Sequence, residues 1–246
     1  METAEPGGAM HTAEHGGAMH TAEPGGTAGR RHPGRPRMDT ARIVDAAMRL
    51  IDEHGADEVT MRSLAEHLGS STSTLYRHFP TRAGLIGAVI DRMFGHVNVD
   101  PAAYRGTPWR AASQRFTENL FEVMGRHRNV SLQIAHHAPI GTNAAVVRER
   151  WLAIMLENGF PVPLAARSGA MIAHLVLGFV IQLGGERADQ QRERRTMATS
   201  VHRLDLTEFP ATAAVAEARW RTTSIEEEFA FALELVLDRL WELHAE

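Results

Sequence analysis

The chain has 246 residues, which is enough for one large domain or two smaller domains with a substantial buried core. Its 43% apolar and 23% charged residues are typical of a soluble globular protein, and a formal net charge of −4 excludes nucleic-acid binding through overall charge alone. Because there is no cysteine, disulfides, iron–sulfur clusters and thiolate zinc sites are excluded. We find neither a signal peptide nor an apolar run of the roughly 18 residues that a membrane span needs, and therefore expect a cytoplasmic protein with no membrane partner.

Residues 1–38 form a low-complexity tail. The nine residues TAEPGGAMH, which begin at Thr3, return almost unchanged as TAEHGGAMH at Thr12. A glycine-rich, apolar-poor sequence buries too little surface to offset its ordering entropy, so the tail is predicted to be disordered. Its histidines could bind a metal ion, although a repeat expanded by replication slippage is the simpler explanation. Arginines, among them Arg35 and Arg37, then accumulate next to the first predicted helix.

Residues 39–93 show the apolar spacing of four consecutive helices. Each predicted helix begins at a residue whose side chain can accept a hydrogen bond from a free backbone amide of the first turn. These capping residues are Asp39 or Thr40, Thr60, Ser70 or Ser71, and Thr81. The predicted inward-facing residues are Ile43, Ala47, Leu50, Ile51, Met61, Leu64, Ala65, Leu68, Leu75, Phe79, Leu85, Ile86, Val89, Ile90 and Met93.

After a loop that contains Pro101 and Pro108, we expect helices almost to the end of the chain. The expected ranges are 109–127, 130–137, 143–158, 163–184, 211–219 and 224–244. The polar, weakly periodic segment 186–209 is predicted to be a mobile loop. Because no stretch of strand length alternates convincingly between apolar and polar residues, the predicted fold class is all-α.

Residues 60–79 have the layout of a helix-turn-helix, in which a short helix, a glycine turn and a second short helix follow one another. Ala65 is small where the two helices must approach, and Gly69 supplies a turn conformation that a Cβ would oppose. Leu75 and Phe79 lie one turn apart and can hold the second helix against its neighbours. This spacing indicates that the second helix of the motif packs onto the two helices before it.

The other face of the second helix carries hydroxyl groups, a tyrosine, an arginine and a histidine, and no acidic residue occurs between positions 67 and 82. Small polar side chains let a helix enter the major groove, and cationic or aromatic polar groups reach phosphates or base edges. A solvated helix of an unrelated bundle is the alternative. Serine and threonine are mediocre helix formers, however, so five of them in one short helix favour a use for their side chains.

The pattern T-x-R-x-L-A-x-x-L-G-x-x-x-x-T-L-Y-x-H-F at residues 60–79, and its segment LYRHF above all, resembles the signature of the tetracycline-repressor (TetR) family. The resemblance implies an all-helical protein with a three-helix DNA-binding domain and a larger helical domain for ligand binding and dimerisation. It assigns double-stranded operator DNA as a partner. The implied DNA contacts are Thr60, Arg62, Ser71, Thr72, Ser73, Thr74, Tyr76, Arg77, His78 and Arg82.

Within this set, Tyr76, His78 and Arg82 are expected to hold phosphates rather than read bases. Arg35 and Arg37 resemble the arginine-bearing arms that enter an adjacent minor groove, and a solvated linker is the equal alternative. The expected domains are therefore the tail at 1–38, the DNA-binding domain at 39–83 and the ligand-binding and dimerisation domain at 84–246.

Sparse marks between residues 109 and 240, such as His127-Arg128 and Phe209-Pro210, resemble the C-terminal domain of the tetracycline-repressor subgroup. The resemblance implies a homodimer built by the helices at 163–184 and 224–244, which would make the operator a palindrome. It also implies a pocket for a small, largely apolar ligand. The candidate pocket residues, of which we expect about a third to line a cavity, are Phe116, Leu120, Phe121, Met124, Ile134, His137, Trp151, Met155 and His174.

The chain departs from the tetracycline-binding pattern. An ungapped alignment on His127-Arg128 places Ile134 where that subgroup has its metal-binding histidine, and Asn98 and Phe116 at two drug-contacting positions. This argues against magnesium–tetracycline as the inducer, and we expect no cofactor. A shift of one or two residues would place His136 or His137 at the metal position, so the participation of a metal stays open.

The function predicted from the sequence is a ligand-responsive repressor that a small molecule releases from DNA. A transcriptional activator and a ligand-independent DNA-binding protein are the alternatives, because the helix-turn-helix does not reveal the sign of regulation. An enzyme is not expected. The titratable clusters have no metal-ligand spacing, and the sequence has neither a glycine-rich phosphate loop nor a G-x-S-x-G motif.

Overall fold

The structure, a computed structural model, describes residues 38–183, 196, 199, 208–214 and 224–245. Every regular element within these residues is helical, so the predicted all-α fold class is confirmed. Nearly all of the predicted tail and most of the predicted loop at 186–209 lie outside the described residues. The predicted helix at 211–219 lies partly outside them, and residues 210–214 are helical.

Four helices follow one another at the N-terminal end of the described chain: α1 (Thr40–His54), α2 (Met61–His67), α3 (Thr72–His78) and α4 (Arg82–Phe94). The predicted caps are confirmed, with Asp39 chosen over Thr40 and Ser71 over Ser70. The side chains of Asp39, Thr60, Ser71 and Thr81 each accept a hydrogen bond from the backbone amide three residues later. Each cap satisfies an amide that the first helical turn leaves without a partner.

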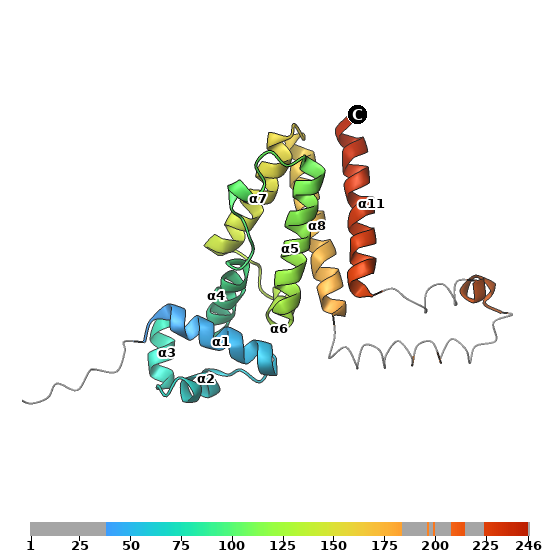
Figure 1. The fold of residues 1–246 in the computed structure, drawn as a ribbon. Helices are drawn as coiled ribbons and strands as arrows, with labels where there is room; N and C mark the ends of the chain where they lie inside the picture. Colours follow the sequence, from blue (N-terminus) through green and yellow to red (C-terminus); the bar gives the residue numbers. More distant parts are fainter. Residues whose placement is uncertain (1–37, 184–195, 197–198, 200–207, 215–223, 246) are drawn as a thin grey trace, which may run out of the picture. The chain divides into compact units, whose positions relative to one another are not determined.

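Predicted inward-facing side chains form the core of this region. Ile43 and Ile51 of α1, Leu64 of α2 and Leu75 of α3 are all completely buried. Figure 1 shows α1, α2 and α3 grouped together, with α4 leading from them to the remaining helices. Because α4 packs against α1 on one side and against α5, α6 and α7 on the other, it joins the two predicted domains.

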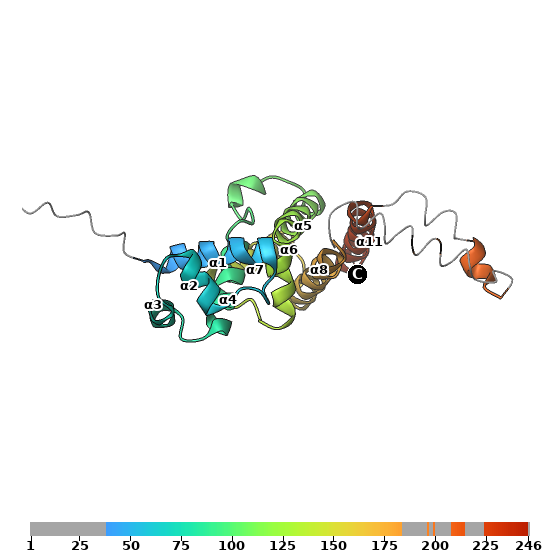
Figure 2. The same cartoon turned by 90° about the horizontal axis from the view of Figure 1, so that it is seen from below.

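Among the described residues that follow α4, four long helices are present, together with short helical turns. The long helices are α5 (Trp109–Arg126), α7 (Thr142–Glu157), α8 (Val162–Gln182) and α11 (Ile225–Ala245). A 3₁₀ helix, η1 (Pro101–Ala103), lies in the expected loop before α5. Figures 1 and 2 show α8 and α11 side by side, and both also contact α5.

The prediction of a single helix over residues 130–137 is wrong in its bounds and in the type of helix. The chain forms a short α-helix, α6 (Arg128–Ser131), and continues as a 3₁₀ helix, η2 (Leu132–Ala135). Helices commonly tighten into 3₁₀ geometry at their ends, and here the amides of both His136 and His137 donate to the carbonyl of Gln133. Apolar spacing alone does not distinguish this tightened turn from a regular helix.

Contrary to the expectation that no segment is long and apolar enough for a membrane span, α8 meets that description by length and composition. The arginine and the histidine within this helix interrupted the apolar run that the sequence analysis required. In the structure α8 packs against α5, α7 and α11 and leaves other apolar side chains, among them Met171 and Ile181, exposed. Its apolar composition is therefore explained by helix packing, together with the exposed face discussed below.

Two neighbouring residues of α4 connect this helix to α1 and to α7. Arg92 donates to Asp45 of α1, with 2.8 Å between Nε and Oδ1. Asp91 accepts from the backbone amide of Ala144 at the start of α7, over 3.0 Å, and so caps that helix from outside. A Cβ at Gly141 would overlap the side chain of Asp91, including its carboxylate, so the cap requires glycine at this position.

We predict opposite effects on stability from two glycine-to-alanine changes. Gly141→Ala displaces the Asp91 carboxylate and lowers the free energy of unfolding by about 1–3 kcal/mol. Gly87→Ala, in the middle of α4 where a Cβ would meet nothing within 4 Å, raises it by about 0.5–1 kcal/mol. Urea denaturation at one fixed protein concentration measures both, and equal effects of the two changes would contradict the proposed cap.

Candidate DNA-binding surface and adjoining groove

The turn between α2 and α3 positions the second helix of the motif. Gly69 adopts a φ of 59°, in the region that favours glycine, and the amide of Ser70 donates to the carbonyl of Ala65 over 2.8 Å. Leu75 and Phe79 are buried, and α3 packs against α2, as expected from the sequence. The opposite face of α3 is consequently directed away from the core.

This outer face of α3 is polar and free of carboxylates. Ser73, Tyr76 and Arg77 are exposed, and Tyr76 is 49% exposed although its side chain is large and aromatic. Thr72 and Thr74 are half-buried, and the hydroxyl of Thr74 forms a hydrogen bond of 3.0 Å with Ser71. A short helix with an exposed tyrosine, an arginine and small hydroxyls has the shape and charge that suit the major groove of DNA.

Two of the predicted contacts also have structural roles. His78 is half-buried, and its Nδ1 lies 3.1 Å from the hydroxyl of Thr40, which joins the end of α3 to the start of α1. Arg82 donates from Nε to the carbonyl of Val59 over 3.2 Å, and from Nη2 to that of Ala56. The Arg82 guanidinium therefore supplies hydrogen bonds to two backbone carbonyls of the loop between α1 and α2. Its proposed phosphate contact stays a prediction.

The remaining predicted contacts are placed differently. The side chain of Arg62 at the start of α2 is 85% exposed and forms an ion pair with Glu66, one turn away on the same helix. Exposed pairs of this kind contribute little stability, so Arg62 can exchange this partner for a phosphate at small cost. Thr60 caps α2 as expected. Arg35 and Arg37 lie outside the described residues.

Most of the candidate ligand residues pack together in the C-terminal core. Phe116, Leu120, Met124, Trp151 and Met155 are buried. The rings of Phe116 and Trp151 lie 5.8 Å apart, and Trp151 Nε1 donates to the hydroxyl of Ser168 over 3.2 Å. Ile134 and His137 are half-buried at the edge, whereas His174 is exposed on α8. Whether this core opens for a ligand stays a prediction.

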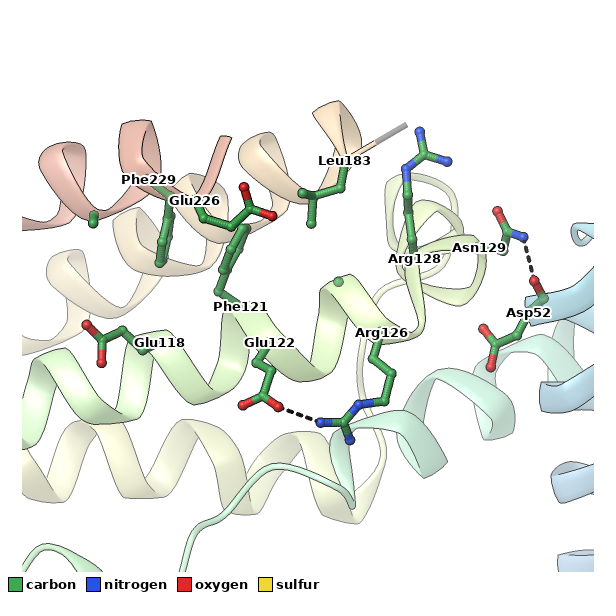
Figure 3. A pocket seen from close by; sticks show the side chains of 12 residues that line it. Asp52, Glu118, Phe121, Glu122, Arg126, Arg128, Asn129, Leu183, Glu226 and Phe229 are labelled. Atoms are coloured by element: carbon green, nitrogen blue, oxygen red, sulfur yellow. Dashed lines mark hydrogen bonds and ion pairs between the residues drawn. The ribbon is translucent and has the colours of Figure 1, made fainter. Parts of the chain in front are cut away.

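A groove of about 780 Å³ lies beside this core, between the end of α1, α5, α6, the end of α8 and the start of α11. Its apolar wall includes Phe121 and Phe229, whose rings stack at 4.1 Å, and Leu183 (Figure 3). Charged side chains, among them an ion pair between Glu122 and Arg126, line the other wall. Sequence reasoning proposed only Phe121 of these residues for a ligand pocket, because they come from five distant segments and most of them have the polar character of an ordinary surface.

Matches to known families cover both parts of the chain. Residues 43–89 match the model of the bacterial regulatory proteins of the TetR family, and residues 101–243 match that of the tetracycline-repressor-like C-terminal domain. The chain belongs to the TetR family. The TetR-family proteins are transcriptional regulators rather than enzymes, and their DNA-binding region corresponds here to the helices that expose Tyr76 and Arg77.

Curated relatives carry names of the same kind. The chain is 30% identical over 173 residues to the HTH-type transcriptional repressor DrrR1 of Streptomyces coeruleorubidus, which is 69% of this chain and 62% of that protein. It is 28% identical over 148 residues to the class D tetracycline repressor of Escherichia coli, covering 59% of this chain and 66% of that protein. The chain thus spans slightly less than two thirds of the length of these two relatives.

Solved TetR-family structures have the same fold. ActR of Streptomyces coelicolor, solved in complex with actinorhodin, aligns with a TM-score of 0.76 at 23% identity, over 85% of this chain and 99% of ActR. The transcriptional regulator SCO7222 of the same organism aligns with a TM-score of 0.70 at 27% identity, over 84% of this chain and 99% of the other. These likenesses agree with the helical DNA-binding and C-terminal regions described above.

Replacing the two arginines of this surface with alanine is predicted to change different properties, namely DNA affinity for Arg77 and folding stability for Arg82. Arg77→Ala removes an exposed cation, so affinity for all DNA sequences falls about equally while the melting temperature stays within a degree or two. Arg82→Ala leaves the carbonyls of the loop unsatisfied and lowers the free energy of unfolding by about 1–3 kcal/mol. Thermal unfolding and fluorescence anisotropy on both variants check this, and an unchanged melting temperature of Arg82→Ala would contradict the role given to the loop contacts.

Proposed function

We propose that this TetR-family protein is a repressor that binds a palindromic operator as a homodimer and leaves it when a small, largely apolar molecule binds the C-terminal domain. The observation that carries the proposal is the outer face of α3, where an exposed tyrosine and arginine lie among small hydroxyl groups. The match to the TetR-family DNA-binding model over residues 43–89 supports the same reading.

Dimerisation is supported by an exposed apolar face on α8 and α11. Met171 and Ile181 of α8 are 39% and 45% exposed, and Phe231 and Leu235 of α11 are 63% and 55% exposed. A Cβ at Gly178, on the same stretch of α8, would meet nothing within 4 Å, which leaves room for a close helix neighbour. Large apolar patches on soluble proteins mark interaction surfaces, and a twofold dimer would bury this one against itself.

Not all small residues of α8 belong to that face. Gly169, one of the glycines of this helix, faces inward, because a Cβ there would lie 3.0 Å from the ring of Trp151. It permits the approach of α7 and α8 within one protomer. Gly178 is therefore the glycine that we assign to the dimer face.

Release by a ligand is proposed to act through α4. This helix holds α1 through Arg92 and α7 through Asp91, so a change in the packing of the C-terminal helices reaches the DNA-binding helices through two neighbouring residues. A ligand that binds better to the DNA-free arrangement shifts the population away from the operator by no more than its difference in affinity. ActR, whose structure was solved with actinorhodin, is a precedent for a bound small molecule in this fold.

An activator is the second candidate function, and a reporter gene downstream of the operator distinguishes the two. Deletion of a repressor raises reporter expression, whereas deletion of an activator lowers it. The names of DrrR1 and the tetracycline repressors support the first outcome.

We predict that Tyr76→Ala weakens operator binding by at least about tenfold, which corresponds to about 1.4 kcal/mol. The side chain is half exposed on α3 and has no place in the core, so the dimer and the melting temperature should not change. Tyr76→Phe, which removes only the hydroxyl, separates its hydrogen bond from the contribution of the ring. Anisotropy titration measures affinity, and unchanged binding by Tyr76→Ala would exclude the proposed docking of α3.

We predict that Phe231→Glu converts the dimer to a monomer, because a charge would be buried at the centre of the apolar face. Ile140→Glu is the matched control, because Ile140 is 88% exposed and precedes α7, away from that face. Size-exclusion chromatography with light scattering gives the mass of each. If Phe231→Glu stays dimeric, the face is not the interface.

A further inference from the structure

Three titratable side chains meet where the DNA-binding helices touch the C-terminal helices. His127, which follows the last residue of α5, lies with its Nδ1 2.7 Å from Oδ2 of Asp52, near the end of α1. His96, two residues after the end of α4, lies with its Nδ1 3.1 Å from Nε2 of the same His127. The chain Asp52–His127–His96 thus joins α1, α4 and the turn between α5 and α6.

The inner part of this chain of contacts is shielded from water, and its outer end is exposed. The side chains of His127 and Asp52 are only 12% and 25% exposed, whereas His96 is exposed at the surface. The centroids of the two imidazole rings lie 5.1 Å apart. Asn129 of α6 also donates to the backbone carbonyl of Asp52, over 3.0 Å. Two histidines and one carboxylate in hydrogen-bond contact at a joint between domains have a geometry that depends on how many protons they hold.

The geometry accepts no more than one extra proton. With both rings neutral, His127 donates from Nδ1 to Asp52 and accepts at Nε2 from His96. With one extra proton on either ring, one of the two nitrogens that face each other still accepts in the contact between the rings. A second proton places an N–H on both nitrogens that face each other, so that contact loses its acceptor and gains a repulsion between like charges.

The surrounding charges oppose the second proton at His96. Its pKa is lowered below 6.5 by partial burial first, and then by His127, by Arg92 of α4 and by Arg126 of α5, against the opposite effect of Asp45 on α1. A pKa lowered by folding means that the unfolded chain binds more protons below pH 6.5, so folded-state stability is full above that pH and is lost as the pH falls through the lowered pKa.

We propose that Asp52, His127 and His96 form a proton-sensitive joint that holds the end of α4 in place at neutral pH and releases it on acidification. On acidification the hydrogen bond between His96 and His127 breaks, whereas His127 keeps its contact with Asp52. The consequence for DNA binding rests on the proposed function, because α4 carries the connections through Asp91 and Arg92 that hold the two domains together. Acidification therefore acts on the helix through which we expect ligand release to act.

The first test is independent of DNA. Urea unfolding of the full-length protein is followed between pH 7.5 and pH 5.0 for the wild type, for His96→Gln and for His136→Gln. Glutamine at position 96 can still donate to His127 and does not titrate, whereas His136 is exposed and lies outside the joint. As the pH is lowered below 6.5, we expect the urea concentration at the unfolding midpoint to decrease for the wild type and for His136→Gln. For His96→Gln we expect a clearly smaller decrease. Parallel curves for all three proteins would overturn the joint.

The second test measures the coupling to DNA. Operator affinity of the same three proteins is titrated by anisotropy at pH 7.5 and pH 5.5. Relative to His96→Gln, the wild type is expected to lose about fivefold or more in affinity at the lower pH, the smallest effect usual for coupled sites. Equal losses would overturn the link between the joint and DNA binding. If no protein binds specifically at pH 7.5, the proposed function fails, and the unfolding curves still decide whether the joint exists.

Discussion

The attachment of α4 on two sides is the constraint on which the rest of the structure depends. Arg92 and Asp91 are adjacent in sequence, yet one binds α1 and the other caps α7. A helix places consecutive side chains about 100° apart, so neighbouring residues can reach different partners without any bend. Both connections use charged groups at the edge of the core, where they can exchange partners more readily than the fully buried Ile86, Val89 and Ile90 of the same helix.

The outer surface of α3 and that of α8 and α11 differ in the way that their proposed roles require. At one end α3 presents hydroxyls, a tyrosine and an arginine around an apolar anchor, Leu75, that is completely buried. At the other end α8 and α11 bury one apolar face within the protomer and expose a second. DNA binding needs a polar face held rigidly, whereas dimerisation needs apolar area that a second copy can cover. The same helical architecture supplies both.

The sequence predicted most of the elements because their signals are local. Caps such as Asp39 and Thr60 act within one turn, and the apolar spacing of α1 to α4 matches the residues found buried. Contacts between distant segments were not predicted. Nothing in the sequence around Arg82 indicates that it donates to carbonyls 23 and 26 residues earlier, a role additional to the phosphate contact that stays a prediction.

The same limitation explains what was missed around the C-terminal helices. The groove beside α5 draws its walls from five segments, and the joint of Asp52, His127 and His96 depends on separations of 75 and 31 residues. A histidine in a polar stretch of sequence gives no sign of its partner. Likewise, apolar spacing does not record the change from α to 3₁₀ geometry after Ser131.

The central claim, that this TetR-family protein recognises a particular DNA sequence, is tested most directly by selection from random-sequence duplexes, followed by titration of the enriched site at several salt concentrations. The account predicts a palindromic site bound by two chains, saturable in the presence of excess random DNA and weakened steeply as salt rises. Enrichment of no sequence, with affinity for every duplex equal to that for random DNA, would contradict it.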